Sequence, residues 1–308
     1  GTARKAFHVD RSSWQVNVQA PTGSIANLAV YSAILGPEDS ILSMYLPDGG
    51  HLSHGWKLPD GKPVSVSSKF FQSSFYRVSP DTGRFEYDEI EETVRRVKPR
   101  LIITGGTAYP RVIDYQKIGE IAHRNGAYYL ADIAHEAGLI AGNAYPSPFP
   151  HADIVTMTSR KTLRGPVGAL IFSKDSEISK EIDTAVFPGL TGGPMLHSIA
   201  GIAVALEEAH TDKFRTYAKQ VLKNAQILAS ELISRDFNLV TGGTDNHLIL
   251  IDVRNKQPDG LIAAVILESA DIITNKNSIP ANGDLPLSLT RHPGLRIGTH
   301  AVTTRAVS

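Results

Sequence analysis

The sequence predicts an α/β protein with a mostly parallel central sheet, helices on both faces of that sheet, and part of a smaller α+β domain at the carboxyl end. Short β-branched runs alternate with amphipathic helices through the first two thirds of the chain. The pattern changes near residues 209–214, where a long helix begins. The 308 residues are enough for more than one domain. We therefore expect a large domain over residues 1–208 and an incomplete small domain over residues 209–308.

The large domain is predicted from four strands and the helices beside them. A first helix is expected to start at residues 22–24. Strands are expected at residues 101–104, 127–131, 153–158 and 167–172, with a helix at residues 114–124. Ligands of parallel sheets bind beyond the carboxyl ends of the strands. Asp132 and Lys161 both fall at such ends, so we expect the functional site there.

The small domain is predicted to begin with a long amphipathic helix, whose apolar face extends from Phe214 to Leu232. A strand at residues 247–253, a helix at residues 259–270 and a strand-like stretch at residues 271–275 follow. This order predicts a second sheet that is covered by helices.

The composition excludes several classes of function. Lysine plus arginine and aspartate plus glutamate both number 31, so the formal net charge is zero and nothing favours a nucleic acid or an anionic membrane as partner. The absence of cysteine excludes disulfides, thiolate nucleophiles and cysteine-bound metals. No apolar run is long enough to span a bilayer. We expect small-molecule partners, no nucleic acid and no membrane.

Two residues at strand ends suit chemistry on a carbonyl cofactor. Lys161 is flanked by hydroxyls and cations, and nearby positive charge lowers the pKa of a lysine, which favours the amine that forms Schiff bases. Asp132 could pair with a protonated pyridine nitrogen. Each also has a plainer interpretation, a solvated loop lysine for Lys161 and a turn cap for Asp132.

Three further groups could complete such a site. Thr22, Gly23 and Ser24 could bind a phosphate at a helix start, or form an ordinary N-cap. His51 could stack on a planar ring; a metal shared with His54 is the competing hypothesis, although the sequence indicates no third ligand. Arg296 could grip a substrate carboxylate, or form a surface ion pair. A sequence that contains all five of these groups is much rarer than one that contains any single group, so the combination favours a cofactor site.

These residues belong to motifs that occur in one order over essentially the whole chain. The motifs cover residues 18–27, 47–55, 80–83, 108–111, 132–139, 161–166, 187–194, 275–277 and 295–299. In these motifs the sequence resembles serine hydroxymethyltransferase. The resemblance implies a pyridoxal 5′-phosphate (PLP) enzyme of fold type I, the aspartate aminotransferase type. It also implies serine–glycine interconversion with tetrahydrofolate as co-substrate, a role in glycine biosynthesis and one-carbon metabolism, a cytoplasmic location, and a homodimer with shared active sites.

The resemblance also implies a role for each matching residue. Lys161 would bind PLP as a Schiff base, Asp132 would pair with the pyridine nitrogen, and His51 would stack on the ring. The remaining cofactor contacts would be Thr107 and His135 near the phenolic oxygen, and Thr22, Gly23 and Ser24 at the phosphate, with Gly193 of the partner subunit. Arg296 would bind the substrate carboxylate. Thr158 would assist the exchange of Lys161 for the substrate amine, and the folate contacts would be Leu46, Gly50, Leu52 and Asn277.

Three departures from the family pattern accompany this resemblance. We find neither the family's amino-terminal arm, with its acid–base glutamate and tyrosines, nor its last helices and strand, so we expect a fragment. Arg160 stands where the family usually has histidine. Two alternatives therefore stay open: a folate-independent enzyme of the threonine aldolase or transaldolase kind, and a catalytically impaired cofactor-binding paralogue or fragment.

Overall fold

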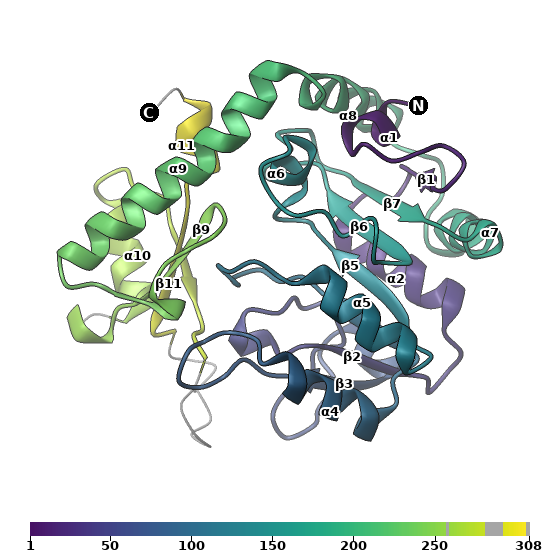
Figure 1. Ribbon diagram of the computed structural model, residues 1–308, viewed down its shortest axis with the longest axis horizontal. Helices are drawn as coiled ribbons and strands as arrows, with labels where there is room; N and C mark the ends of the chain where they lie inside the picture. The colour runs from purple at the N-terminus through teal and green to yellow at the C-terminus, as the bar shows by residue number, and fades with distance from the viewer. Residues whose placement is uncertain (257–258, 281–291, 306–308) are drawn as a thin grey trace.

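The larger of two β-sheets carries the predicted strand ends. The structure is a computed structural model that describes residues 1–256, 259–280 and 292–305 (Figure 1). The strands of the large sheet are β1 (Gln15–Asn17), β2 (Ser40–Met44), β3 (Gln72–Tyr76), β4 (Leu101–Thr104), β5 (Tyr128–Asp132), β6 (Ile154–Thr158) and β7 (Ala169–Ser173). Their order is β1-β7-β6-β5-β4-β2-β3. The pairs from β3 to β6 are parallel, whereas β7 is antiparallel to both neighbours. The prediction of a mostly parallel α/β fold is confirmed.

Helices cover both faces of the large sheet, because alternate strand residues point to opposite sides. In β4, Ile102 belongs to one apolar core and Leu101 and Ile103 to the other. The helices of this part are α1 (Thr2–Ala6), α2 (Gly23–Ile34), α3 (Val66–Phe70), α4 (Tyr87–Val97), α5 (Tyr115–Arg124), α6 (Ala137–Ala141), α7 (Ser176–Thr184) and α8 (Leu196–Ala209), with short turns η1 (Leu46–Asp48) and η2 (Ala185–Leu190). Residues of α2 and α7 pack in the core of Leu101, and residues of α4 and α5 in that of Ile102.

The second sheet contains four antiparallel strands. They are β8 (Asn238–Leu239), β9 (Leu248–Asp252), β10 (Asn275–Asn277) and β11 (Gly294–Gly298), in the order β10-β11-β9-β8. The remaining elements are α9 (Asp212–Ser234), α10 (Gly260–Glu268), α11 (His300–Thr304), η3 (Val240–Gly242) and η4 (Arg254–Lys256). Figure 1 shows α9 running from α8 towards this sheet, on which it packs through Ala229. No helix of the described ranges has the length and apolar character to cross a membrane.

Two expectations about the small domain have different outcomes. The predicted strand at residues 271–275 is wrong, since β10 begins only at Asn275. Asp271 has a φ of 60°, and the Ile272 amide closes the end of α10 by donating to the Leu267 carbonyl, so the chain cannot be extended there. The predicted domain boundary between residues 208 and 209 falls in the last turn of α8, and the division into two domains stays a prediction.

Close packing between α6 and the loop after β6 fixes the backbone next to Lys161. The amide of Gly138 donates to Thr162 Oγ1 at 2.9 Å, and that hydroxyl donates to the His135 carbonyl at 2.6 Å. A Cβ atom on Gly138 would lie 2.2 Å from the carbonyl carbon and oxygen of Thr162. Only glycine therefore lets α6 approach this loop.

We predict that Gly138→Ala lowers the free energy of unfolding by about 1–3 kcal/mol, because the new methyl group would push the loop of Lys161 away from α6. Urea unfolding measures the change. Gly36→Ala is the control, since its Cβ would meet only Asp39 Oδ2, at 3.7 Å. Equal stability of the two variants would show that the contact is not tight.

Candidate active site

A cavity at the carboxyl ends of β5 and β6 brings together seven of the residues predicted from the sequence. Its lining consists of Thr22, Gly23, Ser24, His51, Gly106, Asp132, Ala134, Thr158, Arg160 and Lys161. Asp132 and Thr158 are the last residues of their strands, and Lys161 follows in the next loop. The strand ends therefore meet at one place, as expected for parallel strands.

The Lys161 amine is poised to react as a nucleophile. Burial lowers its pKa, and the positive charges of Arg296 and Arg160 act in the same direction, while Asp132 and Glu136 oppose them. The sequence suggested neighbouring charge as the cause, but burial is the larger one. Arg160 is exposed at the cavity and has no ion pair within the described ranges. This position agrees with a side chain that faces the cavity rather than an acidic partner of the same chain.

Asp132 is a buried carboxylate that stays ionised. Its Oδ2 accepts hydrogen bonds from Asn27 Nδ2 at 2.8 Å and pairs with His54 Nε2 at 3.0 Å, and its Oδ1 accepts from the Ala134 amide at 3.0 Å. Burial raises the pKa of Asp132, but the hydrogen bonds from His54 and Asn27 outweigh it and hold the pKa far below its ordinary value. The bond from the Ala134 amide is the predicted turn cap, and the pairing of Asp132 with a pyridine nitrogen stays a prediction.

His51 lies against the same cavity as a neutral imidazole. Its Nδ1 is 2.7 Å from Ser53 Oγ and accepts from the Ser53 amide at 3.2 Å. Burial lowers its pKa to about 4, with the charges of His54 and Lys161 acting in the same direction and Asp132 opposing them. The ring of His54 is 5.4 Å from that of His51, centroid to centroid.

The amino terminus of α2 supplies the anion-binding side of the cavity. Thr22 caps the helix by accepting a hydrogen bond from the Ile25 amide at 3.4 Å, while Thr22 and Ser24 are exposed. A Cβ atom on Gly23 would lie 2.8 Å from Thr158 Cγ2. The glycine therefore keeps the helix end close to the strand end that precedes Lys161.

This donor set fits PLP. The Lys161 amine matches the aldehyde of PLP, a buried carboxylate matches its pyridine nitrogen, an imidazole matches its ring face, and the helix terminus matches its phosphate. All four groups line one cavity, which is what a single small cofactor requires.

Three predicted residues lie next to this cavity without lining it. Arg296 Nη1, on β11, donates to the Thr107 carbonyl at 2.5 Å, and Thr107 Oγ1 donates to the Gly50 carbonyl at 2.9 Å. His135 follows β5, and its ring stacks on that of His247 at 5.7 Å. Arg296 thus reaches from the small sheet to the large one, and its positive charge lowers the pKa of His135, for which burial is the main cause.

Four other predicted residues are not brought to the cavity. Leu46 lies in η1, Leu52 is 53% exposed, Asn277 pairs with Gly294 at the edge of the small sheet, and Gly193 is exposed with no atom within 4 Å of a built Cβ. Gly50, the remaining folate position, is buried against Met44. Their proposed contacts involve folate or a partner subunit, so they stay predictions.

Two buried residues that contact Asp132 were missed or undervalued. Asn27 is not among the residues predicted from the sequence, although an asparagine three residues after Ser24, among the apolar residues of an expected helix, is a usable signal. The sequence indicates for His54 only a structural or a metal-binding role. The sequence also indicated no third ligand for a metal, whereas Asp132 lies with His51 and His54 within 4.8 Å. Protein hydrogen bonds already engage the facing atoms of Asp132 and His51, so we retain the prediction of no metal.

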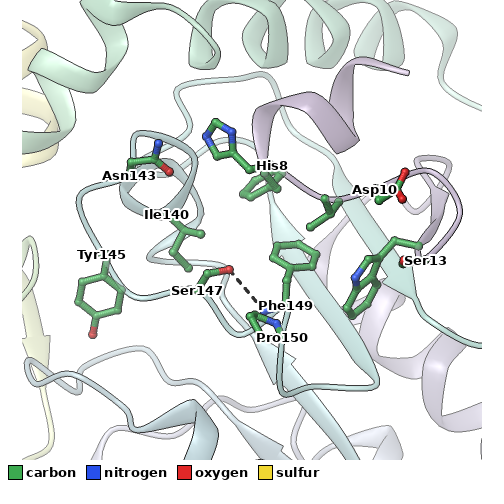
Figure 2. Close-up of a pocket in the computed structure, with 12 residues that line it drawn as sticks. His8, Asp10, Ser13, Ile140, Asn143, Tyr145, Ser147, Phe149 and Pro150 are labelled. Carbon is green, nitrogen blue, oxygen red and sulfur yellow. Dashed lines mark hydrogen bonds between the residues drawn. The ribbon is translucent and has the colours of Figure 1, made fainter.

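A second cavity, of about 400 Å³, lies away from these groups. Figure 2 shows its lining side chains from residues 140–150 together with His8, Asp10 and Ser13. None of the predicted site residues contributes to it. This second cavity is larger than the one around Lys161, but it is not the candidate active site.

Comparison with known proteins gives the family. The sequence model of serine hydroxymethyltransferase matches residues 1–308. The chain belongs to the serine hydroxymethyltransferase family. Members of this family depend on PLP and use tetrahydrofolate as co-substrate, as expected from the resemblance.

Curated relatives of this family match nearly the whole chain. A serine hydroxymethyltransferase of Acidothermus cellulolyticus is 48% identical and covers 99% of this chain, which spans 68% of that protein. The cytosolic serine hydroxymethyltransferase of Oryctolagus cuniculus is 46% identical over 99% of this chain, which spans 65% of it. The enzyme of Desulfotalea psychrophila is 50% identical over 94% of this chain, which spans 66% of it. The chain thus spans about two thirds of the length of these relatives, whose names support a serine hydroxymethyltransferase function.

Glu136, beside the site, gives a testable pH dependence. Burial raises its pKa to about 8 from 4.5, Asp132 adds to the effect and Lys161 opposes it. Between these two values the unfolded chain releases this proton while the folded chain keeps it. The contribution of Glu136 to the free energy of unfolding is therefore complete below about pH 4.5 and falls by about 1.4 kcal/mol per pH unit up to about pH 8.

We predict that Glu136→Gln removes this dependence, so that the variant gains stability relative to the unmodified protein as the pH rises from 5 to 8. Urea unfolding at several pH values measures the difference. Glu92→Gln, on the exposed face of α4, is the control. A constant difference between Glu136→Gln and the unmodified protein would contradict the raised pKa.

Proposed function

We propose that the protein interconverts serine and glycine with tetrahydrofolate as the one-carbon acceptor, using PLP that is bound covalently through Lys161. The observation that carries this proposal is the meeting of a buried Lys161 amine with an ionised Asp132 in one cavity. The family membership supports the same activity. Among the residues that line this cavity, Lys161 is the one with a side-chain amine that can form a Schiff base.

The site residues prepare the cofactor for this chemistry. When bound, PLP supplies an electron sink for the bond that breaks at the substrate α-carbon. Lys161 would hold the cofactor through its amine, and burial and the nearby arginines favour the unprotonated form by lowering the pKa of Lys161. The negative charge of Asp132 would hold a proton on the pyridine nitrogen. Thr22, Gly23 and Ser24 would hold the phosphate at the start of α2.

The substrate is oriented by Arg296 from the small sheet. One guanidinium nitrogen is fixed by the Thr107 carbonyl, which leaves the other N–H groups for a carboxylate. Thr158 Oγ1 donates to the Ala134 carbonyl at 3.3 Å, a weak bond from which the hydroxyl can turn to the substrate amine. We assign Thr107 and His135 to the phenolic oxygen, and Leu46, Gly50, Leu52 and Asn277 to folate.

We also infer a homodimer with shared sites and a cytoplasmic location. The exposed Gly193 is free to reach the phosphate of a partner subunit. Exposed apolar side chains close to it in sequence, Phe187, Met195 and Leu196, are suited to a subunit interface. The cytosolic name of the Oryctolagus cuniculus relative supports the proposed location.

The activity test is glycine formation from serine with PLP, with and without tetrahydrofolate. We predict folate-dependent glycine formation and its loss in Lys161→Gln, because no other amine of the cavity can bind the cofactor. Lys174→Gln, just after β7, is the matched control.

Borohydride reduction and peptide mapping should place the cofactor on Lys161. Label on another lysine would refute the assignment, and glycine formation without folate would indicate an aldolase-type enzyme.

Arg296→Ala tests the carboxylate clamp. Charged hydrogen bonds contribute about 1.5–3 kcal/mol each, so we predict glycine binding weaker by roughly tenfold or more, with the cofactor retained. Glycine titration followed by the visible absorbance of the cofactor gives both quantities. Arg254→Ala, paired with Asp252 at the surface, is the control. Unchanged affinity for glycine in Arg296→Ala would rule out the clamp.

A further inference from the structure

A continuous chain of hydrogen bonds links the acid of the site to its imidazole. Asn27 Nδ2 lies 2.8 Å from Asp132 Oδ2 and 2.9 Å from Ser53 Oγ, and Ser53 Oγ lies 2.7 Å from His51 Nδ1. On the other side, Thr156 Oγ1 lies 2.7 Å from Asn27 Oδ1. Asn27 and Thr156 are buried, so water cannot replace these partners. These hydrogen bonds connect α2, the loop after η1, β5 and β6.

The direction of each bond follows from the charge of Asp132. An ionised carboxylate only accepts hydrogen bonds, so the amide group of Asn27 must turn its NH₂ towards Asp132 and its oxygen towards Thr156. The same nitrogen also lies 3.3 Å from His54 Nε2, but that atom is a donor to the ionised Asp132, so the second hydrogen of the NH₂ is directed at Ser53 Oγ. The Ser53 oxygen accepts this bond, and its own hydrogen is left for His51 Nδ1, its remaining partner within the described ranges.

The backbone enforces the same direction at His51. The Ser53 amide also points at His51 Nδ1, at 3.2 Å, and a backbone N–H can only donate. A proton on Nδ1 would therefore face two donors. With Nδ1 acting as acceptor, the ring carries its proton on Nε2 and has no positive charge.

We propose that Asn27 and Ser53 are positioning residues that transmit the polarity of Asp132 to His51 and hold His51 as the neutral Nε2–H tautomer. The groups that face His51 are His54 from its own loop, Asp132 at the end of β5 and Lys161 after β6. Of these, only Asp132 favours a charged imidazole, and it lies behind the donors of Asn27 and His54. The low pKa of His51 agrees with this arrangement.

The consequence for the site rests on the proposed function. If Asp132 keeps the pyridine ring protonated, a charged imidazole on the face of that ring would repel it. A neutral His51 can stack without this repulsion, so one carboxylate sets both the charge of the cofactor ring and the neutrality of the imidazole that covers it.

Nitrogen NMR of protein labelled with ¹⁵N-histidine tests the tautomer directly. Spectra are recorded for the protein with PLP and after its removal, and the His51 signals are assigned by their loss in His51→Asn. We expect a bare Nδ1 and a protonated Nε2 that do not titrate between about pH 5.5 and pH 8, since the pKa is about 4. A charged ring, or a proton on Nδ1, would overturn the proposal.

Two variants separate the relay from general loosening of the site. In Ser53→Ala, the amide donor to His51 Nδ1 remains but the hydroxyl at 2.7 Å is lost, so we expect the Nδ1 signal to shift and the titration midpoint to rise above about 4. In Asn27→Ala, Ser53 loses the donor that fixes the direction of its hydroxyl, so the Nδ1 signal should shift in the same direction. Ser43→Ala, which removes the buried hydroxyl that donates to the His54 carbonyl at 2.7 Å, is the control and should leave the His51 signals unchanged.

The outcomes distinguish this proposal from the proposed function. An unchanged Nδ1 signal and midpoint in Ser53→Ala would overturn the relay even if the protein makes glycine from serine. A shifted Nδ1 signal in Ser53→Ala without PLP would support the relay even if Lys161 carried no cofactor. Weaker PLP binding in Ser53→Ala at pH 6, with recovery at pH 8, would support the role of neutrality in stacking, and equal affinity at both pH values would refute that role.

Discussion

A negative charge buried at the end of β5 is the constraint on which the site depends. Removing a carboxylate from water is costly unless donors replace the lost hydration, and Asp132 receives them from three directions. The three donors are the backbone amide of Ala134 just after β5, the side-chain amide of Asn27 on α2, and the ring of His54 in the loop after η1. The placement of α2 and of this loop against β5 is thus tied to a single ionised group.

The same arrangement explains which parts of the molecule could be predicted from sequence. The strands β4, β5, β6 and β9 were predicted to within one or two residues, because runs of buried β-branched and aliphatic side chains make a strong local signal. The strand at residues 271–275 failed because one residue, Asp271, adopts a left-handed conformation that no apolar pattern reveals. Lys161 and Asp132 were found because strand ends are recognisable and their motifs match a family.

The partners of these residues were harder to predict because they come from distant parts of the chain. Asn27 and Asp132 are 105 residues apart, and Arg296 and Thr107 are 189 apart. Such pairs depend on how α2 and the small sheet settle against the large sheet, and local propensity does not encode this. The imidazoles of His135, His247 and His300 belong to the same class, since their rings meet where the two sheets adjoin.

The contact between Arg296 and the Thr107 carbonyl has a mechanical consequence. It belongs to a seam that also contains the ion pair of Arg111 with Asp245, at 2.8 Å, and both contacts run between the two sheets. Under the proposed roles, an amino acid would be held at its carboxylate by one sheet and at its amine by the other. A ligand that binds only the assembled arrangement adds its binding free energy to the cohesion of that arrangement. A bound amino acid would therefore link the two sheets and restrict their relative motion. The two sheets would move more freely whenever the substrate is absent.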